Sequence, residues 1–274
     1  MNKNIRSFDL LGKTALVRFP NNFSIKDKKE FALNLMKKQK SIKTVLEKAG
    51  EIKGRLRKLS TNFIAGENTK EIVYKENNCI FKFNIDKTYF SSRLSNERKE
   101  ISSLIKKDEV VLVMFAGVAP FSIVIAKNSK AKKVYSNELN REANKYALIN
   151  IKLNKLEDKI ILIPGDIKKV TEKIIKKTEI NKDNKEKIPT SFDVIVMPRP
   201  QLKESFLKEA FSLSKKGTRI YYYDFCKQDE KEKIITKIKK EAKEFKKRIE
   251  ILNVKNAGEI APYKIRLRVD FKVL

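Results

Sequence analysis

The stretch VVLVMFAGVAPFS, Val110–Ser122, decides how the fold is interpreted. It begins as an unbroken apolar run, which is typical of a buried strand, and the run breaks at Gly117. A glycine here lets the backbone approach a ligand without a Cβ in the way, and the residues that follow it have a helical pattern. The stretch is therefore predicted to form a buried strand, whose end is either an ordinary turn or the cradle of a cofactor.

Strands and helices alternate from about Tyr89 to the end of the chain, with the apolar strand at 110–114 as the first. Helices are expected between most strands, including one over 202–217 and a Lys-rich one over 229–249, and the polar segment 178–191 is expected to be a surface loop. This alternation predicts a mainly parallel sheet that is covered by helices on both faces. The further strands are expected at 133–138, 160–166, 192–198, 219–225 and 263–274.

The first part of the chain has a different pattern. A strand is expected at 13–19, a helix over 27–50 and a hairpin over 71–85, with a basic, glycine-marked loop before the hairpin. The change of pattern predicts two domains. Residues 1–88 would form a small basic α+β domain, and residues 89–274 would form a Rossmann-like α/β catalytic domain.

The composition excludes several classes of protein. No apolar stretch in the 274 residues approaches the roughly 20 residues of a membrane span, and the start lacks the apolar core of a signal peptide, so we expect a cytoplasmic protein. The chain has no histidine, and Cys79 and Cys226 are isolated, so we expect no disulfide scaffold and no metal site. Acid–base chemistry must then come from carboxylates, Lys, Tyr or the backbone.

The charge points to a polyanionic partner. Lys and Arg number 63 against 34 acidic residues, which gives a formal net charge of +29. A surface this positive favours contact with nucleic acid. A coding bias toward Lys, Ile and Asn is the alternative explanation of the same composition.

Acidic residues follow two of the expected strands. Glu138 ends the second strand of the catalytic half, where a carboxylate can accept both hydroxyls of a ribose, and Asp166 ends the third, where it can accept a hydrogen bond from an exocyclic amine. No GKS, GKT or GxGxxG motif accompanies them. This combination favours S-adenosylmethionine over NAD or ATP, although each carboxylate alone is equally explained as an exposed turn residue.

Several motifs together carry a family resemblance. The segments YFSSRLSNER (89–98), MFAGVAPFSI (114–123) and VYSNELNREANKYALINIKLNKLEDKI (134–160), with GD at 165–166, resemble the tRNA (guanine-37 N1) methyltransferases of archaea and eukaryotes. The likeness covers nearly the whole chain. It implies a class I S-adenosylmethionine-dependent methyltransferase domain that follows an RNA-binding domain and acts, as a monomer, on the tRNA anticodon stem-loop. Family members often carry a further small amino-terminal domain, for which this chain has no room.

The resemblance also implies roles for individual residues. Glu97 matches the carboxylate proposed as the general base for the guanine N1 proton, Arg57 an arginine that steadies the guanine, and Tyr89 a tyrosine of the cofactor and base pocket. The alternative is that Glu97 and Arg98 form only an ion pair at a helix start and that Arg57 is one basic residue among many. The expected cofactor-binding residues are Arg98, Phe115, Ala116, Gly117, Pro120, Glu138, Leu139, Asp166, Ile167 and Pro198, and the expected RNA-binding residues are Arg57, Arg93, Arg199 and Pro200.

The chain departs from the family pattern at three positions. Val113 stands where an Asp is usual, and Ala119 replaces the second glycine of the turn. Pro198 stands where the family has an Asn that lines the target-base pocket; Arg199 follows it, and Pro200 is retained. Arg199 could replace the lost amide by reaching guanine O6 or a phosphate, or the change could indicate a different target.

Three functions are therefore open from the sequence. The first is methylation of N1 of guanine 37. The second is a wyosine-pathway reaction, either transfer of an aminocarboxypropyl group or methylation of a wyosine intermediate. The third is RNA binding without catalysis, in a relative that has lost activity through the changes at Val113, Ala119 and Pro198.

Overall fold

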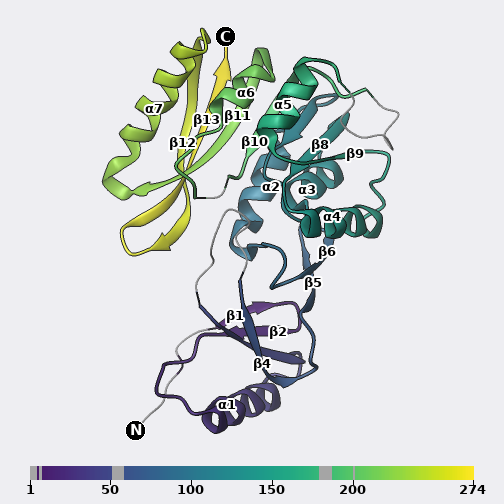
Figure 1. Ribbon diagram of the computed structural model, residues 1–274, viewed down its shortest axis with the longest axis vertical. Coiled ribbons are helices and arrows are strands. Elements are labelled where there is room, and N and C mark those ends of the chain that lie inside the picture. The colour runs from purple at the N-terminus through teal and green to yellow at the C-terminus, as the bar shows by residue number, and fades with distance from the viewer. Residues whose placement is uncertain (1–4, 6–7, 51–58, 179–186, 200) are drawn as a thin grey trace.

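The computed structural model describes residues 5, 8–50, 59–178, 187–199 and 201–274. Figure 1 shows a small lobe, which holds the amino terminus, below a larger lobe that holds the carboxyl terminus. Among the described residues the strands form a four-stranded sheet, a seven-stranded sheet and a two-stranded hairpin. No helix in this part of the chain is long and apolar enough to cross a membrane.

The large sheet follows the predicted α/β pattern. Its strand order is β12-β13-β11-β10-β7-β8-β9, and the five strands from β11 to β9 run parallel, whereas β13 is antiparallel to both of its neighbours. This order confirms the predicted mainly parallel α/β sheet. The strands are β7 (Val110–Val113), β8 (Lys133–Glu138), β9 (Ile160–Pro164), β10 (Phe192–Met197), β11 (Ser214–Lys227), β12 (Ile249–Ala261) and β13 (Lys264–Val273).

Helices cover both faces of this sheet because its strands are apolar on both sides. Val111 and Val113 of β7 join one core cluster and Leu112 and Met114 the other, as the alternation of strand side chains requires. The first cluster includes residues of α2 (Ser95–Leu104), α3 (Pro120–Asn128) and α4 (Arg141–Leu153). The second includes residues of α5 (Ile167–Ile175), α6 (Leu207–Ser212) and α7 (Lys231–Glu244).

The small lobe has one sheet and one helix. The sheet order is β1 (Phe8–Leu11), β2 (Thr14–Val17), β3 (Thr44–Lys48) and β4 (Thr61–Gly66), and α1 (Ile25–Lys38) packs on it through an apolar cluster. The helix predicted over 27–50 was wrong in its second half, because α1 ends at Lys38. The β-branched residues Thr44 and Val45 instead pair with Thr14 and Ala15 of β2 and are buried there.

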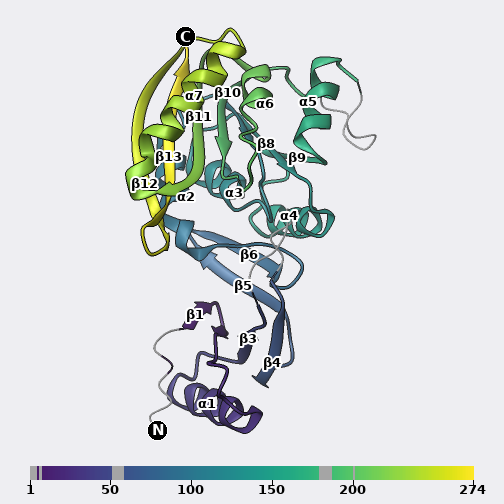
Figure 2. The ribbon, with the colours of Figure 1, turned by 60° about the vertical axis from the view of Figure 1, so that its left-hand side comes forward.

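β5 (Glu71–Glu76) and β6 (Cys79–Asn84) form the hairpin that was predicted over 71–85, and this hairpin joins the lobes. In Figure 2 it lies between the small lobe and α4. The amides of Asn150 and Asn154 on α4 bond to the backbone of β6: Lys82 N donates to Asn150 Oδ1 over 2.6 Å, and Ile80 N to Asn154 Oδ1 over 3.0 Å. The hairpin is therefore packed against α4 of the large lobe.

The small lobe also contacts the hairpin closely. Gly12, in the turn between β1 and β2, has φ +58°, and a Cβ there would lie 2.0 Å from the carbonyl oxygen of Val73. No side chain fits at that distance, so the turn needs glycine both for its conformation and for this approach. The β1–β2 turn is thereby fixed against β5.

Two further predictions differ from the structure near the carboxyl end. The helix expected over 202–217 is limited to α6, because Phe206 has a left-handed φ of +60° immediately before the helix starts. The helix expected over 229–249 ends at Glu244, and the long strand β12 that follows was not predicted. Most residues of β12 are exposed or half-buried, since it is an edge strand, so it lacks the apolar run that marked the inner strands. Two short 3₁₀ turns, Ser92–Leu94 and Gln228–Glu230, precede α2 and α7.

Candidate active site

The carboxyl ends of four adjacent strands form the predicted cofactor edge. In the order β10-β7-β8-β9, the chain leaves β7 toward β8 on one side and has β10 on the other, so the strand order reverses between β7 and β10. The structure brings the expected residues together at this edge. Phe115, Ala116, Gly117 and Pro120 follow β7, Glu138 and Leu139 end β8, Asp166 and Ile167 follow β9, and Pro198 follows β10.

The turn after β7 is fixed by Glu138. Its Oε2 accepts a hydrogen bond from Gly117 N over 2.7 Å, and its Oε1 accepts one from Asn140 N over 2.7 Å. Phe115, Gly117 and Ala119 all have left-handed φ values, of +58°, +59° and +66°. Ala119 is fully buried in the conformation that glycine favours, which explains why the family has a glycine at this position.

The rim of this edge combines an apolar ring with a helix start. The ring of Phe115 lies edge-on to that of Phe206, with centroids 4.9 Å apart. Asp166 is the N-cap of α5, and its Oδ1 accepts a hydrogen bond from Lys168 N over 3.0 Å. These features suit the adenosine part of S-adenosylmethionine: a turn without a Cβ at Gly117, a carboxylate held in place at Glu138 and an apolar ring at Phe115.

We expect Gly117→Ala to weaken binding of S-adenosylmethionine by about tenfold, which corresponds to about 1.4 kcal/mol. Alanine is disfavoured at a φ of +59°, so the turn is strained, although its Cβ would only touch the Tyr89 carbonyl oxygen at 3.4 Å. Isothermal titration calorimetry measures the change. Gly217→Ala is the matched control, because Gly217 has φ +89° but no atom within 4 Å of a Cβ. An equal loss of affinity in both variants would contradict the proposed role of the turn.

Glu97, the expected general base, lies in a buried network of charges. It is 6% exposed, in the first turn of α2. Its Oε2 accepts hydrogen bonds from the Tyr223 hydroxyl over 2.9 Å and from Arg268 Nη1 over 2.8 Å, and Lys255 Nζ is 3.5 Å from its Oε1. Arg268 also bonds Asp270 over 2.8 Å. The carboxylate is thus held on one oxygen by two donors.

The electrostatics of this network keep its donors protonated. Burial raises the pKa of Tyr223 well above its usual value, and the nearby charge of Glu97 raises it further. Burial alone lowers the pKa of Arg268, but hydrogen bonds to Asp270 and Glu100 more than compensate, so the pKa of Arg268 rises above its usual value. Both groups therefore donate to Glu97 at neutral pH.

The network lies at the same edge as the cofactor turn. The last residue pair between β10 and β11 is Met197 with Tyr222. Tyr223 is therefore level with Pro198, the first residue after the end of β10. Tyr223 pairs in turn with Arg268 on β13. Glu97, which bonds to both Tyr223 and Arg268, therefore lies on the side of the loop after β10.

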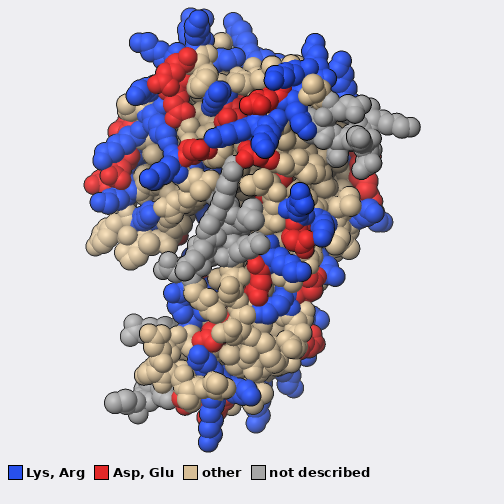
Figure 3. Space-filling model, viewed as in Figure 1, with Lys and Arg blue, Asp and Glu red and all other residues tan. Residues whose placement is uncertain are grey.

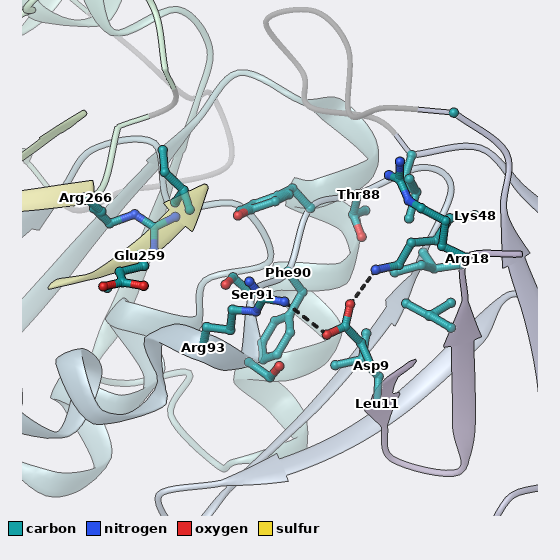
Figure 4. Close-up of a pocket in the computed structure, with 18 of the residues that line it drawn as sticks. Asp9, Leu11, Arg18, Lys48, Thr88, Phe90, Ser91, Arg93, Glu259 and Arg266 are labelled. Atoms are coloured by element: carbon teal, nitrogen blue, oxygen red, sulfur yellow. Dashed lines mark hydrogen bonds and ion pairs between the residues drawn. The ribbon is translucent and has the colours of Figure 1, made fainter. Parts of the chain in front are cut away.

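An interdomain cavity of about 410 Å³ adjoins this edge. Figure 4 shows its walls: Asp9, Arg18 and Lys48 come from the small lobe, Thr88 and Arg93 from the segment before α2, and Glu259 and Arg266 from β12 and β13. Tyr89 lines it too, and the Tyr89 carbonyl oxygen lies next to Gly117. Tyr89 thus links the cavity to the turn after β7.

Arg93, an expected RNA-binding residue, lies in this cavity. Its Nη2 is 3.3 Å from Asp9 Oδ1, and its side chain is 69% exposed. Lys48 also bonds to Asp9. Arg93 therefore joins the two lobes at the rim of the cavity while its side chain stays open to solvent.

Two other expected site residues are instead buried in structural ion pairs. Arg98, expected beside the cofactor, is 1% exposed and bonds Glu76 of β5 through Nε over 2.5 Å and Nη2 over 2.7 Å. Its Nη2 also donates to the Ser91 carbonyl over 2.9 Å. The expectation was drawn from its position in the motif, whereas the fold turns the side chain toward the hairpin.

Arg199 was expected to reach guanine or a phosphate, and the structure differs. It is 3% exposed; Nη2 bonds Asp224 Oδ1 over 2.5 Å, and Nη1 donates to the carbonyls of Leu202 and Glu204 over 3.0 and 2.9 Å. This guanidinium holds the loop after β10 on β11, so it does not replace the missing Asn. Arg57 and Pro200, the remaining expected residues, lie outside the described part of the chain.

Sequence reasoning missed Tyr223, Lys255 and Arg268. One signal was available in IRLRVDF at 265–271, where charged residues alternate with apolar ones in the expected final strand. Arg266, Arg268 and Asp270 thereby share the sheet face that carries α2. A row of charges on a covered face indicates a buried polar network.

The sheet order, the glycine turn and the carboxylate at the end of β8 define a Rossmann-like methyltransferase of the type predicted from the sequence. The comparison with known families agrees, because the model of the TRM5/TYW2 methyltransferase domain matches residues 72–252. The chain belongs to this family, which confirms the predicted resemblance and the predicted enzyme class.

Individual relatives are similar over nearly the whole chain. The chain is 32% identical to a tRNA (guanine(37)-N(1))-methyltransferase Trm5b of Pyrococcus abyssi over 97% of its own length and 74% of the relative's. A crystal structure of that protein superposes with a TM-score of 0.82, over 98% of this chain and 75% of the other.

Two other matches bear on substrate and RNA. A tRNA (guanine(37)-N(1))/4-demethylwyosine(37)-methyltransferase Taw22 of Nanoarchaeum equitans is 32% identical, over 98% of this chain and 100% of the relative. A complex of aTrm5 with tRNALeu has a TM-score of 0.80 at 30% identity, over 98% of this chain and 72% of that one.

Proposed function

We propose that this protein is an S-adenosylmethionine-dependent tRNA methyltransferase that methylates N1 of guanine 37, beside the anticodon. The observation that carries the proposal is Glu97, a buried carboxylate that two donors hold in one orientation. Family membership and the relatives named above support the same reaction. Basic side chains, which lie on both lobes in Figure 3, and the net charge of +29 suit an RNA substrate.

The reaction needs a base because guanine N1 carries a proton that must leave as the new bond forms. Bound S-adenosylmethionine supplies a methyl group activated by its sulfonium. Glu97 takes the N1 proton, and Tyr223 and Arg268 hold its carboxylate in a single orientation. Arg57, by the family resemblance, stabilises the negative charge that builds on guanine O6. The main task of the protein is to align the base with the methyl group.

The target base must reach the candidate active site from within the tRNA. The N1 edge is paired or stacked in a helix, so the base must leave its stack to reach the edge of the sheet, as anticodon-loop bases can. The small lobe and the interdomain cavity would hold the anticodon stem-loop. We further propose that the protein acts as a monomer in the cytoplasm.

Tyr223→Phe is expected to lower kcat by about tenfold to a hundredfold, with little change in the KM for either substrate. The variant keeps the ring, which packs edge-on against Phe121 at 5.9 Å, and removes the donor to Glu97. A carboxylate that loses a donor holds its proton more tightly, so the acid limb of the rate profile should move to higher pH. Single-turnover rates across pH measure both effects.

Tyr222→Phe is the matched control for that variant. Tyr222 is equally buried, but its hydroxyl bonds Asp224 over 3.0 Å on the opposite face of the sheet. Its loss should reduce stability without moving the pH profile. An unchanged rate in Tyr223→Phe, or the same change in both variants, would remove Tyr223 from the mechanism.

A second candidate function is methylation of a wyosine intermediate at the same position. Two observations favour it. The Nanoarchaeum equitans relative, which is matched over its whole length, has a name that includes 4-demethylwyosine. Pro198 also changes the loop that lines the base pocket in the family, and Arg199 is turned away from that pocket.

One experiment separates these reactions. The protein is incubated with unmodified tRNA, or with tRNA carrying the wyosine precursor, and S-adenosylmethionine labelled on both the methyl and carboxypropyl carbons. Nuclease digestion and mass spectrometry then locate the product. Methyl label on N1 of guanine 37 supports the main proposal, methyl label only on the precursor supports the second, and carboxypropyl label would overturn both. Binding of tRNA without any transfer would indicate a relative that only binds RNA.

A further inference from the structure

Arg266 is the most unusual charged residue of the interdomain cavity. It is 7% exposed, and its guanidinium lies over the ring of Phe225, 5.3 Å from the ring centroid. No hydrogen bond or ion pair joins it to any residue in the described part of the chain. A guanidinium has five N–H donors, and in a side chain with so little exposed surface they need acceptors from water or from a bound ligand. Such an arrangement suits a ligand that supplies the acceptors.

The position of Arg266 connects it to the candidate site. It pairs with Phe225, two residues along β13 from Arg268, which pairs with Tyr223. Arg266 and Arg268 therefore face the same side of the sheet, and Arg268 reaches Glu97 whereas Arg266 lines the cavity. A ligand bound to Arg266 would therefore lie near Glu97, the carboxylate that is proposed to act on the base.

The charges around the cavity favour an anion. Four cationic side chains line it, Arg18, Lys48, Arg93 and Arg266, against the carboxylates of Asp9 and Glu259. Burial raises the pKa of Asp9, but bonds to Lys48 and Arg93 outweigh this and lower it. The negative charge of Asp9 is therefore already balanced by these two cations.

Glu259 does not balance the remaining charge. Figure 4 draws it beside Arg266, yet no ion pair between these two described residues is formed, and Glu259 is exposed. Arg18, on the opposite wall, is also exposed and has no ion pair among the described residues. Arginines therefore remain available on two walls, one from each lobe.

We propose that this cavity is a phosphate-binding subsite for the RNA strand, in which Arg266 and Arg18 hold the backbone beside the target nucleotide. The proposal rests on the tRNA substrate proposed above. A guanidinium fork binds phosphate oxygens through paired, charge-assisted bonds, and phosphate contacts fix the register of a bound strand. A volume of about 410 Å³ admits a nucleotide, and Tyr89 joins the subsite to the cofactor turn.

The test is the salt dependence of RNA binding by the full chain. The affinity for an anticodon stem-loop RNA is measured by fluorescence anisotropy over a range of KCl concentrations, for wild type and Arg266→Gln. Losing one phosphate contact should weaken binding by roughly tenfold at low salt and reduce the slope of log K against log salt by about 0.7 to 0.9. Arg266→Lys, which keeps the charge, should restore most of the slope.

Two control variants separate a local contact from net charge. Lys216→Gln removes the same charge at the amino end of β11, on the opposite edge of the sheet, and should leave the slope unchanged. Glu259→Gln removes the carboxylate beside Arg266 and should tighten binding rather than weaken it. Equal effects of Arg266→Gln and Lys216→Gln would overturn the subsite.

A second measurement distinguishes phosphate from base recognition. Methylphosphonate linkages placed singly around position 37 should weaken binding to wild type at one or two linkages, and Arg266→Gln should show no further loss there. If the variant instead loses affinity only when the base at position 37 is guanine, with the slope unchanged, Arg266 contacts the base edge and the proposal fails.

The outcomes also separate this inference from the proposed function. A wild-type protein that neither binds nor modifies tRNA contradicts the function itself. A wild-type protein that methylates tRNA, with an Arg266→Gln variant of unchanged slope, contradicts only the subsite. Binding of S-adenosylmethionine and the melting temperature show whether the variant is folded. If it is not, Arg18→Gln, at an exposed residue, is the variant that decides, with the same expected change in slope.

Discussion

Glu97→Gln is expected to reduce the single-turnover rate of methyl transfer by about a hundredfold to ten-thousandfold, which is the range of a general base. The amide keeps the shape of the side chain and can still accept the hydrogen bond that Tyr223 donates over 2.9 Å. Arg268 keeps its bonds to Glu100 and Asp270, over 2.7 and 2.8 Å, so the buried network retains its anions. The affinities for S-adenosylmethionine and tRNA should therefore change little.

Glu100→Gln is the matched control on the same helix. Glu100 shares Arg268 and Lys255 with Glu97, but its side chain is 35% exposed and lies near one turn farther along α2. Bonds to Lys255 and Arg268 outweigh burial and lower the pKa of Glu100, so it is charged at neutral pH and well placed to be a structural counter-ion. We expect its loss to cost less than tenfold in rate. Full activity of Glu97→Gln, or equal losses in both variants, would show that the network is only structural.

The part of the site that the sequence predicted depends on local pattern. Strand 133–138 and the strands around it were recognised from apolar runs, and parallel strands joined by helices bring their carboxyl ends to one edge. The placement of Gly117, Glu138 and Asp166 at that edge follows from this rule without any knowledge of long-range contacts. Their sequence positions alone were therefore sufficient.

The part that could not be predicted depends on partners far along the chain. Glu97 is held by Tyr223 and Arg268, which are 126 and 171 residues away, and nothing in the sequence near Glu97 indicates them. Arg98 and Arg199 have motif positions that suggest ligand contacts, but their true partners lie on other strands. Whether an arginine faces a cofactor or a buried carboxylate is decided by packing.

The segment 27–50 shows a second limit. Its apolar residues fit helical spacing throughout, and the end at Lys38 has no glycine or proline to mark it. The strand that follows is stabilised by pairing with β2 and β4, so the tertiary contacts decide its structure against the local pattern. A short segment whose apolar residues fit both the helical and the strand repeat cannot be assigned from sequence alone.

The pair of Arg98 and Glu76 predicts the largest effect on stability. We expect Glu76→Gln to lower the free energy of unfolding by about 3 to 5 kcal/mol, because it leaves the Arg98 charge buried without its anion. The two side chains are 1% and 3% exposed, and two charge-assisted bonds of 2.5 and 2.7 Å join them. For a protein of this size the melting temperature should fall by roughly 10 °C. Glu204→Gln breaks an exposed pair with Lys168 and should cost less than about 1 kcal/mol.

The double variant Glu76→Gln with Arg98→Met tests what this pair does. Replacing both charges removes the unpaired cation, so part of the lost stability should return. The Met side chain also keeps the contact that the arginine makes with the Phe90 ring, 5.2 Å away. If Arg98 serves only to hold the hairpin on α2, the double variant should bind S-adenosylmethionine as wild type does, measured by calorimetry below its melting temperature. A loss of cofactor affinity in a folded double variant would instead place Arg98 beside the cofactor, as its motif position first suggested, and would mean that one side chain serves both the hairpin and the pocket.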